Sequence, residues 1–305
     1  MIKDLQKDQL ITGFFAIKDI AEKETREAKK KYLDLILVDT SGQINAKAWD
    51  ISEVLIGEQP QRGDIVKAEV LVQEYKGSLQ LKLNKFRKAT ETDSYEPQEI
   101  IPSAPIPAQE MWATVCRFAE AIADEQLHAA VQTVLQKYHD SLLTHPAAKT
   151  YHHSYKSGLL QHISTMLLAA EKITSVYPCN TDLLYAGIIL HDIGKLHELG
   201  TDATGLGTEY SLEGELMGHI PLGLLELEHL TLDAEKKLLI QHMILSHHQI
   251  PEWGSPKRPM FKEAELLHHL DMIDARMFDF DKAQAEEGKL SPRIPSLERK
   301  VYRPT

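Results

Sequence analysis

The first 90 residues show the alternation of hydrophobic and polar positions that predicts β-strands. The predicted strands cover Leu10–Ile20, Tyr32–Asp39, Ile44–Asp50 and two further segments on either side of a turn at Lys76–Ser78. In the third strand the side chains of Ile44, Ala46 and Ala48 share one face. Five short strands in this stretch favour a small Greek-key barrel, and the alternative is a small β-domain that binds no ligand.

The regular pattern stops between residues 91 and 109 and then resumes with a different period. The interruption contains Pro97, Pro102, Pro105 and Pro107, which predict a semi-rigid linker. From residue 110 to residue 280 apolar residues recur every three to four positions, which predicts an all-α helical bundle. One such stripe consists of Leu159, Ile163, Met166, Leu167 and Ala170. Residues 281–305 lack a clear period, so they are expected to form a tail that packs on another surface or is disordered.

The composition is consistent with two domains, one of β-strands and one of helices, because 305 residues exceed the usual size of a single core. No apolar run is long enough to span a membrane, and the N-terminus lacks the apolar core of a signal peptide. Cys116 and Cys179 are far apart in sequence and provide no disulfide framework, which favours a reducing cytoplasm. The net charge is -11, but residues 1–90 carry 16 basic and 14 acidic residues, so the acidic total does not exclude nucleic acid as a partner of this part.

The helical part contains all 15 histidines, and several of them recur at similar intervals with aspartates. The candidate metal ligands are His162, His191, Asp192, His219, His247, His248 and Asp271. Successive candidates are 24 to 29 residues apart, which is the length of one helix and a connection, so a bundle can return them to one place. Imidazoles and carboxylates suit divalent manganese, iron, cobalt, nickel or zinc. The sequence does not decide between His247 and His248.

Asp192 and Lys195 are the candidate catalytic residues because they follow a buried apolar run, Tyr185–Leu190. A carboxylate can bridge two metal ions, so Asp192 is expected to lie between two ions about 3.5–4 Å apart, beside a nucleophilic hydroxide. Lys195 lies four residues after His191 and is expected to meet a phosphate oxygen of the substrate.

Further candidate contacts with the substrate lie on both sides of the ligand set and in the barrel. In the helical domain they are His152, His153 and Arg258, the last of which could equally be an ordinary surface charge. In the barrel, the candidates for nucleic-acid binding are Phe14, Tyr32, Trp49, Lys85 and Arg87. Exposed aromatic rings can stack on bases, and cations can follow the phosphates, although core packing and solvated charge are the alternatives.

The ligand candidates resemble the H…HD…D pattern of the HD-domain metal-dependent phosphohydrolases. The pattern falls on His162 in "GLLQH", His191-Asp192 in "LHDIGK" and Asp271 in "HLDMIDA". The segments "HHSYKSGLLQH", "EGELMGHI", "SHHQIPEWGSPKRPM" and "EAELLHHLDMIDARM" narrow the resemblance to the YhaM family of 3′–5′ exoribonucleases. This resemblance implies an OB-fold that binds single-stranded nucleic acid, an HD domain that releases nucleotides from the 3′ end, and manganese as the working metal.

Other functions remain open at this point. The first is an HD-type phosphohydrolase that acts on small nucleotides or cyclic dinucleotides. Cyclic-dinucleotide enzymes carry a Gly-Tyr-Pro element after the paired histidines, whereas this chain has Gly254-Ser255-Pro256. The second is a non-enzymatic single-strand-binding protein with a structural metal. The sequence also leaves open whether DNA is a substrate besides RNA and whether the chain forms a homo-oligomer.

Overall fold

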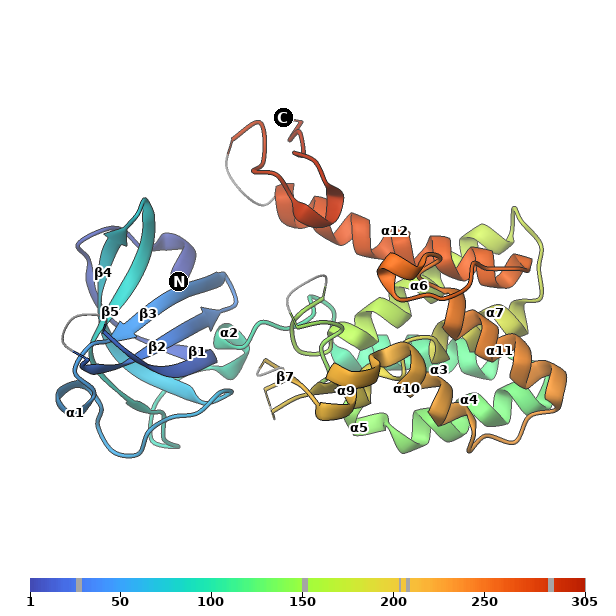
Figure 1. Ribbon diagram of the computed structural model, residues 1–305, viewed down its shortest axis with the longest axis horizontal. Helices are drawn as coiled ribbons and strands as arrows, with labels where there is room; N and C mark the ends of the chain where they lie inside the picture. Colours follow the sequence, from blue (N-terminus) through green and yellow to red (C-terminus); the bar gives the residue numbers. More distant parts are fainter. Residues whose placement is uncertain (26–28, 150–152, 203, 207–208, 285–287, 305) are drawn as a thin grey trace. The chain divides into compact units, whose positions relative to one another are not determined.

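The computed structural model describes residues 1–25, 29–149, 153–202, 204–206, 209–284 and 288–304. These residues form two compact units, one built from Met1–Ser103 and Gly200–Glu209 and the other from Ala104–Leu199 and Tyr210–Thr305 (Figure 1). The first unit therefore contains most of the segment predicted as a linker, including the short helix α2 (Pro97–Ile100), and ten residues from the middle of the predicted helical domain.

The first unit is a closed five-stranded barrel with the strand order β1-β2-β3-β5-β4. The strands are β1 (Leu10–Glu24), β2 (Lys31–Asp39), β3 (Gly42–Ala48), β4 (Ile65–Tyr75) and β5 (Ser78–Lys88). Neighbouring strands pair antiparallel except β3 and β5, which run parallel. Two short helices, η1 (Ile2–Asp4) and α1 (Ile51–Val54), precede β1 and follow β3. The five strands and the closed barrel confirm the predicted fold of this part.

The interior of the barrel is filled by one face of each strand. Leu35 on β2 pairs with Ala46 on β3, and both side chains are fully buried. The predicted shared face of Ile44, Ala46 and Ala48 is thus confirmed as the inner face. Because strands alternate sides at every residue, this pairing register places the intervening polar side chains on the outer surface.

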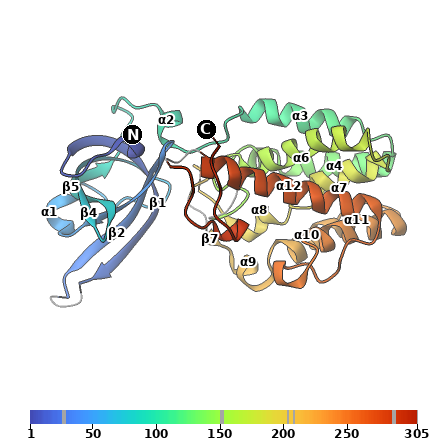
Figure 2. The same ribbon diagram turned by 90° about the horizontal axis from the view of Figure 1, so that it is seen from above.

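The second unit is helical (Figure 2). Its main hydrophobic core extends through most of its helices. Its helices are α3 (Ala108–Glu120), α4 (Glu125–Lys137), α5 (His139–Leu142), α6 (Gly158–Thr174), α7 (Thr181–Leu190), α8 (Lys195–Glu198), α9 (Leu212–Met217), α10 (His219–Leu227), α11 (Ala234–Ser246), η2 (Pro251–Trp253), α12 (Lys262–Gln284) and η3 (Pro295–Leu297). A short pair of strands, β6 (Leu199–Gly200) and β7 (Glu209–Tyr210), lies between α8 and α9 in the chain. Every residue of the predicted stripe on α6 is buried, which confirms that this helix faces the core.

The C-terminal residues pack on the end of α12 rather than forming a disordered tail. Leu297 and Val301 are buried and form a small core with Ala283 of α12. Leu290 pairs with Tyr302 in an antiparallel bridge. Residues 281–305 were expected either to pack on another surface or to be disordered, and their described part packs. The first of them belong to α12, which extends to Gln284. In the described part of the chain, no helix is both long and apolar enough to cross a membrane.

Candidate metal centre

The centre is built around the end of α7, which is buried from Leu183 to Leu190 and carries two polar residues into the core. His191 ends the helix and is fully buried, and Asp192, which follows it, is 1% exposed. The chain turns at Gly194, where a Cβ atom would lie 2.0 Å from the backbone oxygen of His219. Glycine therefore permits the close approach of α10, which brings His219 to the centre.

The two carboxylate oxygens of Asp192 face two different groups of imidazoles. Its Oδ2 atom lies 3.3 Å from Nε2 of His191 and 3.6 Å from Nε2 of His162. Its Oδ1 atom lies 3.7 Å from Nε2 of both His219 and His247. Asp271 joins the first group, because its Oδ1 atom is 3.5 Å from Nε2 of His162. The structure thus brings together residues from α6, α7, α10, α11 and α12 that are more than 100 residues apart in sequence.

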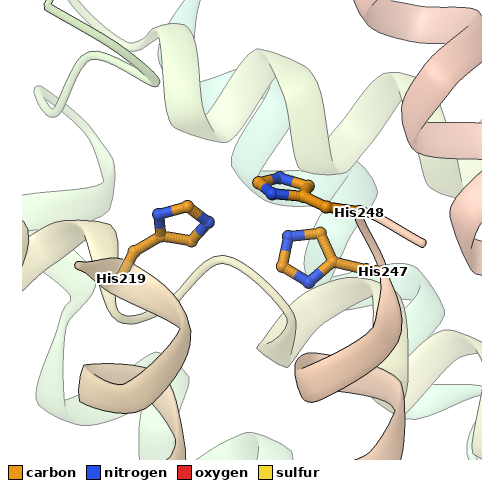
Figure 3. Close-up of side chains that lie close together, drawn as sticks. All are labelled: His219, His247 and His248. Carbon is orange, nitrogen blue, oxygen red and sulfur yellow. The ribbon is translucent and has the colours of Figure 1, made fainter. Parts of the chain in front are cut away.

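His248 completes the second group (Figure 3). His219 stands at the start of α10, and His247 and His248 follow α11, with the three rings gathered in one place. Each ring offers a nitrogen that lies within 4.8 Å of those of the other two. A similar triad in the first group consists of His162, His191 and Asp192. The sequence could not choose between His247 and His248, and the structure places both at the centre.

All five of these histidines are oriented by an oxygen acceptor at Nδ1. The acceptors are Asp274 for His162 (2.7 Å), the Ile188 carbonyl for His191 (2.8 Å), Glu198 for His219 (3.2 Å), the Ile244 carbonyl for His247 (2.7 Å) and the Trp253 carbonyl for His248 (2.5 Å). An imidazole that donates from Nδ1 presents an unprotonated Nε2 with its lone pair. Such hydrogen bonds are typical of metal-binding histidines.

Three buried atoms at the centre have no hydrogen-bond partner among the described residues. They are Oδ1 of Asp192 and Nε2 of both His219 and His247. A buried polar atom without a partner costs about 1–3 kcal/mol, so three together indicate that a ligand belongs there. The atoms are all Lewis bases, and the set of imidazole nitrogens and carboxylate oxygens fits divalent transition-metal ions.

Asp192 and Lys195 form a buried ion pair at the same centre. Nζ of Lys195 lies 2.6 Å from Oδ2 of Asp192. Burial alone would raise the pKa of Asp192, but the ammonium of Lys195 and the imidazole of His191 hold it well below its usual value. Burial would likewise lower the pKa of Lys195, but the Asp192 carboxylate raises it above its usual value. Both groups are therefore charged.

Two carboxylates that position the histidines escaped the sequence prediction. Asp274 accepts hydrogen bonds from His162 and, at 2.8 Å, from Nε2 of His153. Glu198 accepts from the ring and from the backbone N–H of His219. The only sequence signal was spacing, because Asp274 follows Asp271 by three positions on one helix and Glu198 follows Lys195 likewise.

His153 was expected to contact the substrate, and its position differs from that expectation. Its side chain is buried, with Nδ1 2.8 Å from the Tyr155 hydroxyl and Nε2 bound to Asp274. The ring therefore supports the carboxylate that orients His162. The other predicted contact in this segment, His152, lies outside the described residues.

A pocket of about 580 Å³ opens onto the centre. Lys195, His219, His248 and Asp271 line one part of it. Arg258, a predicted substrate contact, is exposed and is not among the lining residues. Two arginines that the sequence did not single out, Arg276 and Arg299, line the pocket instead. No periodic signal marks them: Arg276 lies inside the quoted segment "EAELLHHLDMIDARM" on α12 but was not singled out there, and Arg299 lies in the C-terminal segment.

The candidate nucleic-acid contacts of the barrel fall into two groups. Trp49 is 42% exposed and its ring lies 4.8 Å from that of Tyr32, which forms an aromatic pair on the outer surface. Lys85 is exposed as well. By contrast, Phe14 packs against Tyr95 with ring centroids 4.9 Å apart, and Arg87 forms two hydrogen bonds with Asp93, at 2.6 and 2.7 Å. These last two predicted residues are thus already engaged within the protein.

Both units match known families. An HD domain model matches residues 159–276, and a model of the OB-fold nucleic acid binding domain matches residues 19–89. The 3′-5′ exoribonuclease YhaM of Bacillus velezensis is 40% identical over 306 residues, which cover 97% of this chain and 95% of the relative. The proteins of the same name from Bacillus subtilis (40% identical, 90% and 89% covered) and Listeria monocytogenes (36% identical, 99% and 97% covered) are similar throughout as well.

Proposed function

Because the chain belongs to the YhaM family of 3′–5′ exoribonucleases, we propose that it is a metal-dependent hydrolase that removes nucleotides from the 3′ end of single-stranded RNA. The observation that carries this proposal is the position of Asp192, whose two oxygens face separate groups of histidine Nε2 atoms. The barrel supports it as well, because an OB-fold is a module that binds nucleic acid.

Two divalent ions would share Asp192. His162, His191 and Asp271 would hold one ion, and His219, His247 and His248 the other. When bound, such a pair activates water as the nucleophile and stabilises the charge that develops at phosphorus. Because negative charge develops at phosphorus during hydrolysis, the protein must supply a fixed and charged environment.

The chain's own residues provide that environment in three ways. The ammonium of Lys195 is held by Asp192 at the pocket wall, where it neutralises a non-bridging phosphate oxygen. Asp274 and Glu198 keep His162 and His219 in the tautomer that exposes Nε2. The end of α7, His191 and Asp192 are buried, so protein closes the inner side of the centre.

Manganese is the working ion in this proposal, as the resemblance to the YhaM family implies; the mixed imidazole and carboxylate donors also suit cobalt, iron and nickel. Single-stranded DNA is a second substrate, since neither the ions nor Lys195 requires a 2′-hydroxyl. The chain acts in the cytoplasm, as expected from two widely spaced cysteines that are both present as thiols.

The segment after the paired histidines favours the exoribonuclease over a cyclic-dinucleotide phosphohydrolase. Ser255 occupies the middle of Gly254-Ser255-Pro256, is fully buried, and its hydroxyl accepts a hydrogen bond of 2.9 Å from the backbone N–H of His248. The segment therefore supports a histidine instead of presenting a side chain to a ligand.

The test uses one single-stranded RNA 20-mer labelled either at its 5′ or at its 3′ end, with manganese present. We expect the 5′ label to appear in a ladder that shortens one nucleotide at a time, and the 3′ label to appear at once in a mononucleotide. The Asp192→Ala variant, prepared in parallel, controls for contaminating nucleases. Internal cleavage products, or a mononucleotide released first from the 5′ end, would contradict the proposal.

A further inference from the structure

The C-terminal segment of the chain packs against α12 in a defined conformation. We call Ser291–Arg303 the C-terminal hook. Leu297 and Val301 pack on Ala283, and the guanidinium of Arg303, which is 8% exposed, donates a hydrogen bond of 2.5 Å to the Ala283 carbonyl. A segment with its own small core and a buried arginine holds a fixed position, so the residues between these anchors are held in place as well.

The hook contributes one wall of the pocket above the metal centre. Its tip is a closed loop, in which the backbone N–H of Ile294 donates to the carbonyl of Arg299 at 2.9 Å. Glu298 closes this loop with a left-handed backbone conformation (φ 54°). All residues from Pro295 to Arg299 line the pocket, together with Asp271 of the metal centre. The metal centre and the hook therefore face one space.

Two exposed arginines line this pocket, Arg276 on α12 and Arg299 on the hook. Neither Arg276 nor Arg299 forms a salt bridge within the described part of the chain, although Asp279 and Glu298 line the same pocket. Nε of Arg299 donates to the Leu297 carbonyl at 3.1 Å, which fixes the plane of the guanidinium and leaves its terminal N–H groups for another acceptor. In a chain with a net charge of -11, cations that stay unpaired beside carboxylates favour an anionic ligand.

We propose that Arg299 of the C-terminal hook, assisted by Arg276, binds a backbone phosphate of the nucleic-acid strand upstream of the bond that is cleaved. This inference rests on the proposed exonuclease function. The two N–H groups of a guanidinium fork match two phosphate oxygens. In the proposed function the metal pair and Lys195 already bind the scissile phosphate, so the arginines are left for another phosphate. The pocket of about 580 Å³ has the size of a site for a nucleotide rather than for a single phosphate. Tyr210 and Trp253, which are 41% and 48% exposed, add aromatic surface for a base.

The experiment compares Arg299→Ala and Arg299→Lys with Arg293→Ala, which removes an exposed arginine of the same hook that does not line the pocket. Two substrates are used: a tetranucleotide, and bis(p-nitrophenyl) phosphate, which has no upstream phosphate. For Arg299→Ala, we expect kcat/KM to fall about tenfold more on the tetranucleotide than on the small diester, mainly through KM. Arg299→Lys should recover part of the loss, and Arg293→Ala should behave like the unaltered chain.

A second readout separates this inference from the proposed function. Binding of a fluorescent single-stranded RNA to the full chain is measured after removal of metal, at several salt concentrations. Arg299→Ala should bind more weakly, and the slope of log affinity against log salt should become shallower by about 0.7, as for one lost phosphate contact on a single strand. If the chain binds RNA but does not cleave it, the proposed function is wrong, but the binding measurement still tests whether Arg299 contacts a phosphate. Equal losses on both substrates, or an unchanged salt slope, would overturn the role of Arg299.

Discussion

At the scale of single residues, orientation of the imidazoles decides what the centre can bind. Asp274 contacts no proposed metal position directly, yet one of its oxygens accepts hydrogen bonds from both His162 and His153. Burial alone would raise the pKa of Asp274, but the hydrogen bonds from His153 and His162 outweigh burial and hold the pKa far below its usual value, so the carboxyl is ionised. A carboxylate in this position fixes a tautomer and strengthens the ligand that it touches.

Asp274→Asn should therefore weaken metal binding without preventing the helical domain from folding. The amide keeps the shape of the side chain but loses its charge, and we expect the apparent affinity for manganese to fall about 10- to 100-fold. Calorimetric titration of chelator-treated protein measures this affinity. Asp279→Asn is the matched control, since Asp279 lies on the same helix and lines the pocket. Equal affinities for the two variants would show that Asp274 does not tune the site.

Spacing along the chain was enough to predict which residues gather, because successive candidates are one helix and one connection apart; most stand near a helix end, and Asp271 lies in the middle of α12. His162, Asp192 and Asp271 lie together as expected, although their role as ligands stays a prediction. Their supporting partners could not be predicted, because a hydrogen bond such as that from His162 to Asp274 joins residues 112 positions apart. The backbone carbonyls that orient the other rings leave no mark in the sequence at all.

At the scale of elements, the close packing of the turn after α7 against α10 sets the distance between the two groups of ligands. Gly194 lies in this turn with ordinary helical dihedral angles, so its importance comes from space and not from backbone freedom. A Cβ atom there would meet the backbone oxygen of His219 at 2.0 Å and the backbone nitrogen of Gly223 at 2.6 Å. Backbone atoms cannot rotate away as side chains do.

Gly194→Ala should displace α10 and so separate His219 from Asp192. We expect a loss of about 1–3 kcal/mol in the free energy of unfolding, which is the usual cost of overpacking, and weaker binding of the second manganese ion. Gly187→Ala is the control, because its added methyl would meet the flexible end of Met243 and not the backbone. Urea denaturation and metal titration of both variants provide the comparison. A Gly194→Ala variant as stable as the unaltered chain, with both ions bound, would refute this interpretation.

Most elements were predictable because their hydrophobic periods are regular. The strand pairs around Lys76–Ser78 and the stripe of α6 show this directly. The C-terminal hook was not predictable, since its core consists of a few residues such as Leu297 and Val301, too few to produce a period. The prolines after residue 90 correctly marked an irregular segment, but they did not reveal that α2 would pack on the barrel through Ile100.

At the scale of the whole molecule, we propose that substrate capture and chemistry belong to different units. All proposed ligands lie in the second unit, and the exposed pair of Tyr32 and Trp49 lies on the barrel. Residues 91–305 carry 18 basic and 31 acidic side chains and so repel a polyanion, whereas the barrel is close to neutral. We therefore expect a long strand to gain more from the barrel than a dinucleotide does.

Trp49→Ala in the full chain should reveal this division of labour. We expect kcat/KM on a 20-mer to fall about 5- to 100-fold, the equivalent of one lost base stack at about 1–3 kcal/mol, and the rate on a dinucleotide to stay the same. The control is Tyr75→Ala, which removes an aromatic ring of the barrel that is 58% exposed and stands apart from the Tyr32–Trp49 pair. If both substrates slow equally, the aromatic pair does not bind the strand.

The most direct test of the centre is the number of ions that one chain holds. The full-length protein is purified without chelator, soaked in manganese, freed of excess ion, and its metal content is measured beside that of Asp192→Ala. Two ions per chain are expected for the unaltered protein, and fewer than one for the variant, since Asp192 faces both histidine groups. Fewer than one ion in the unaltered chain, or two ions in the variant, would contradict a metal pair built around Asp192.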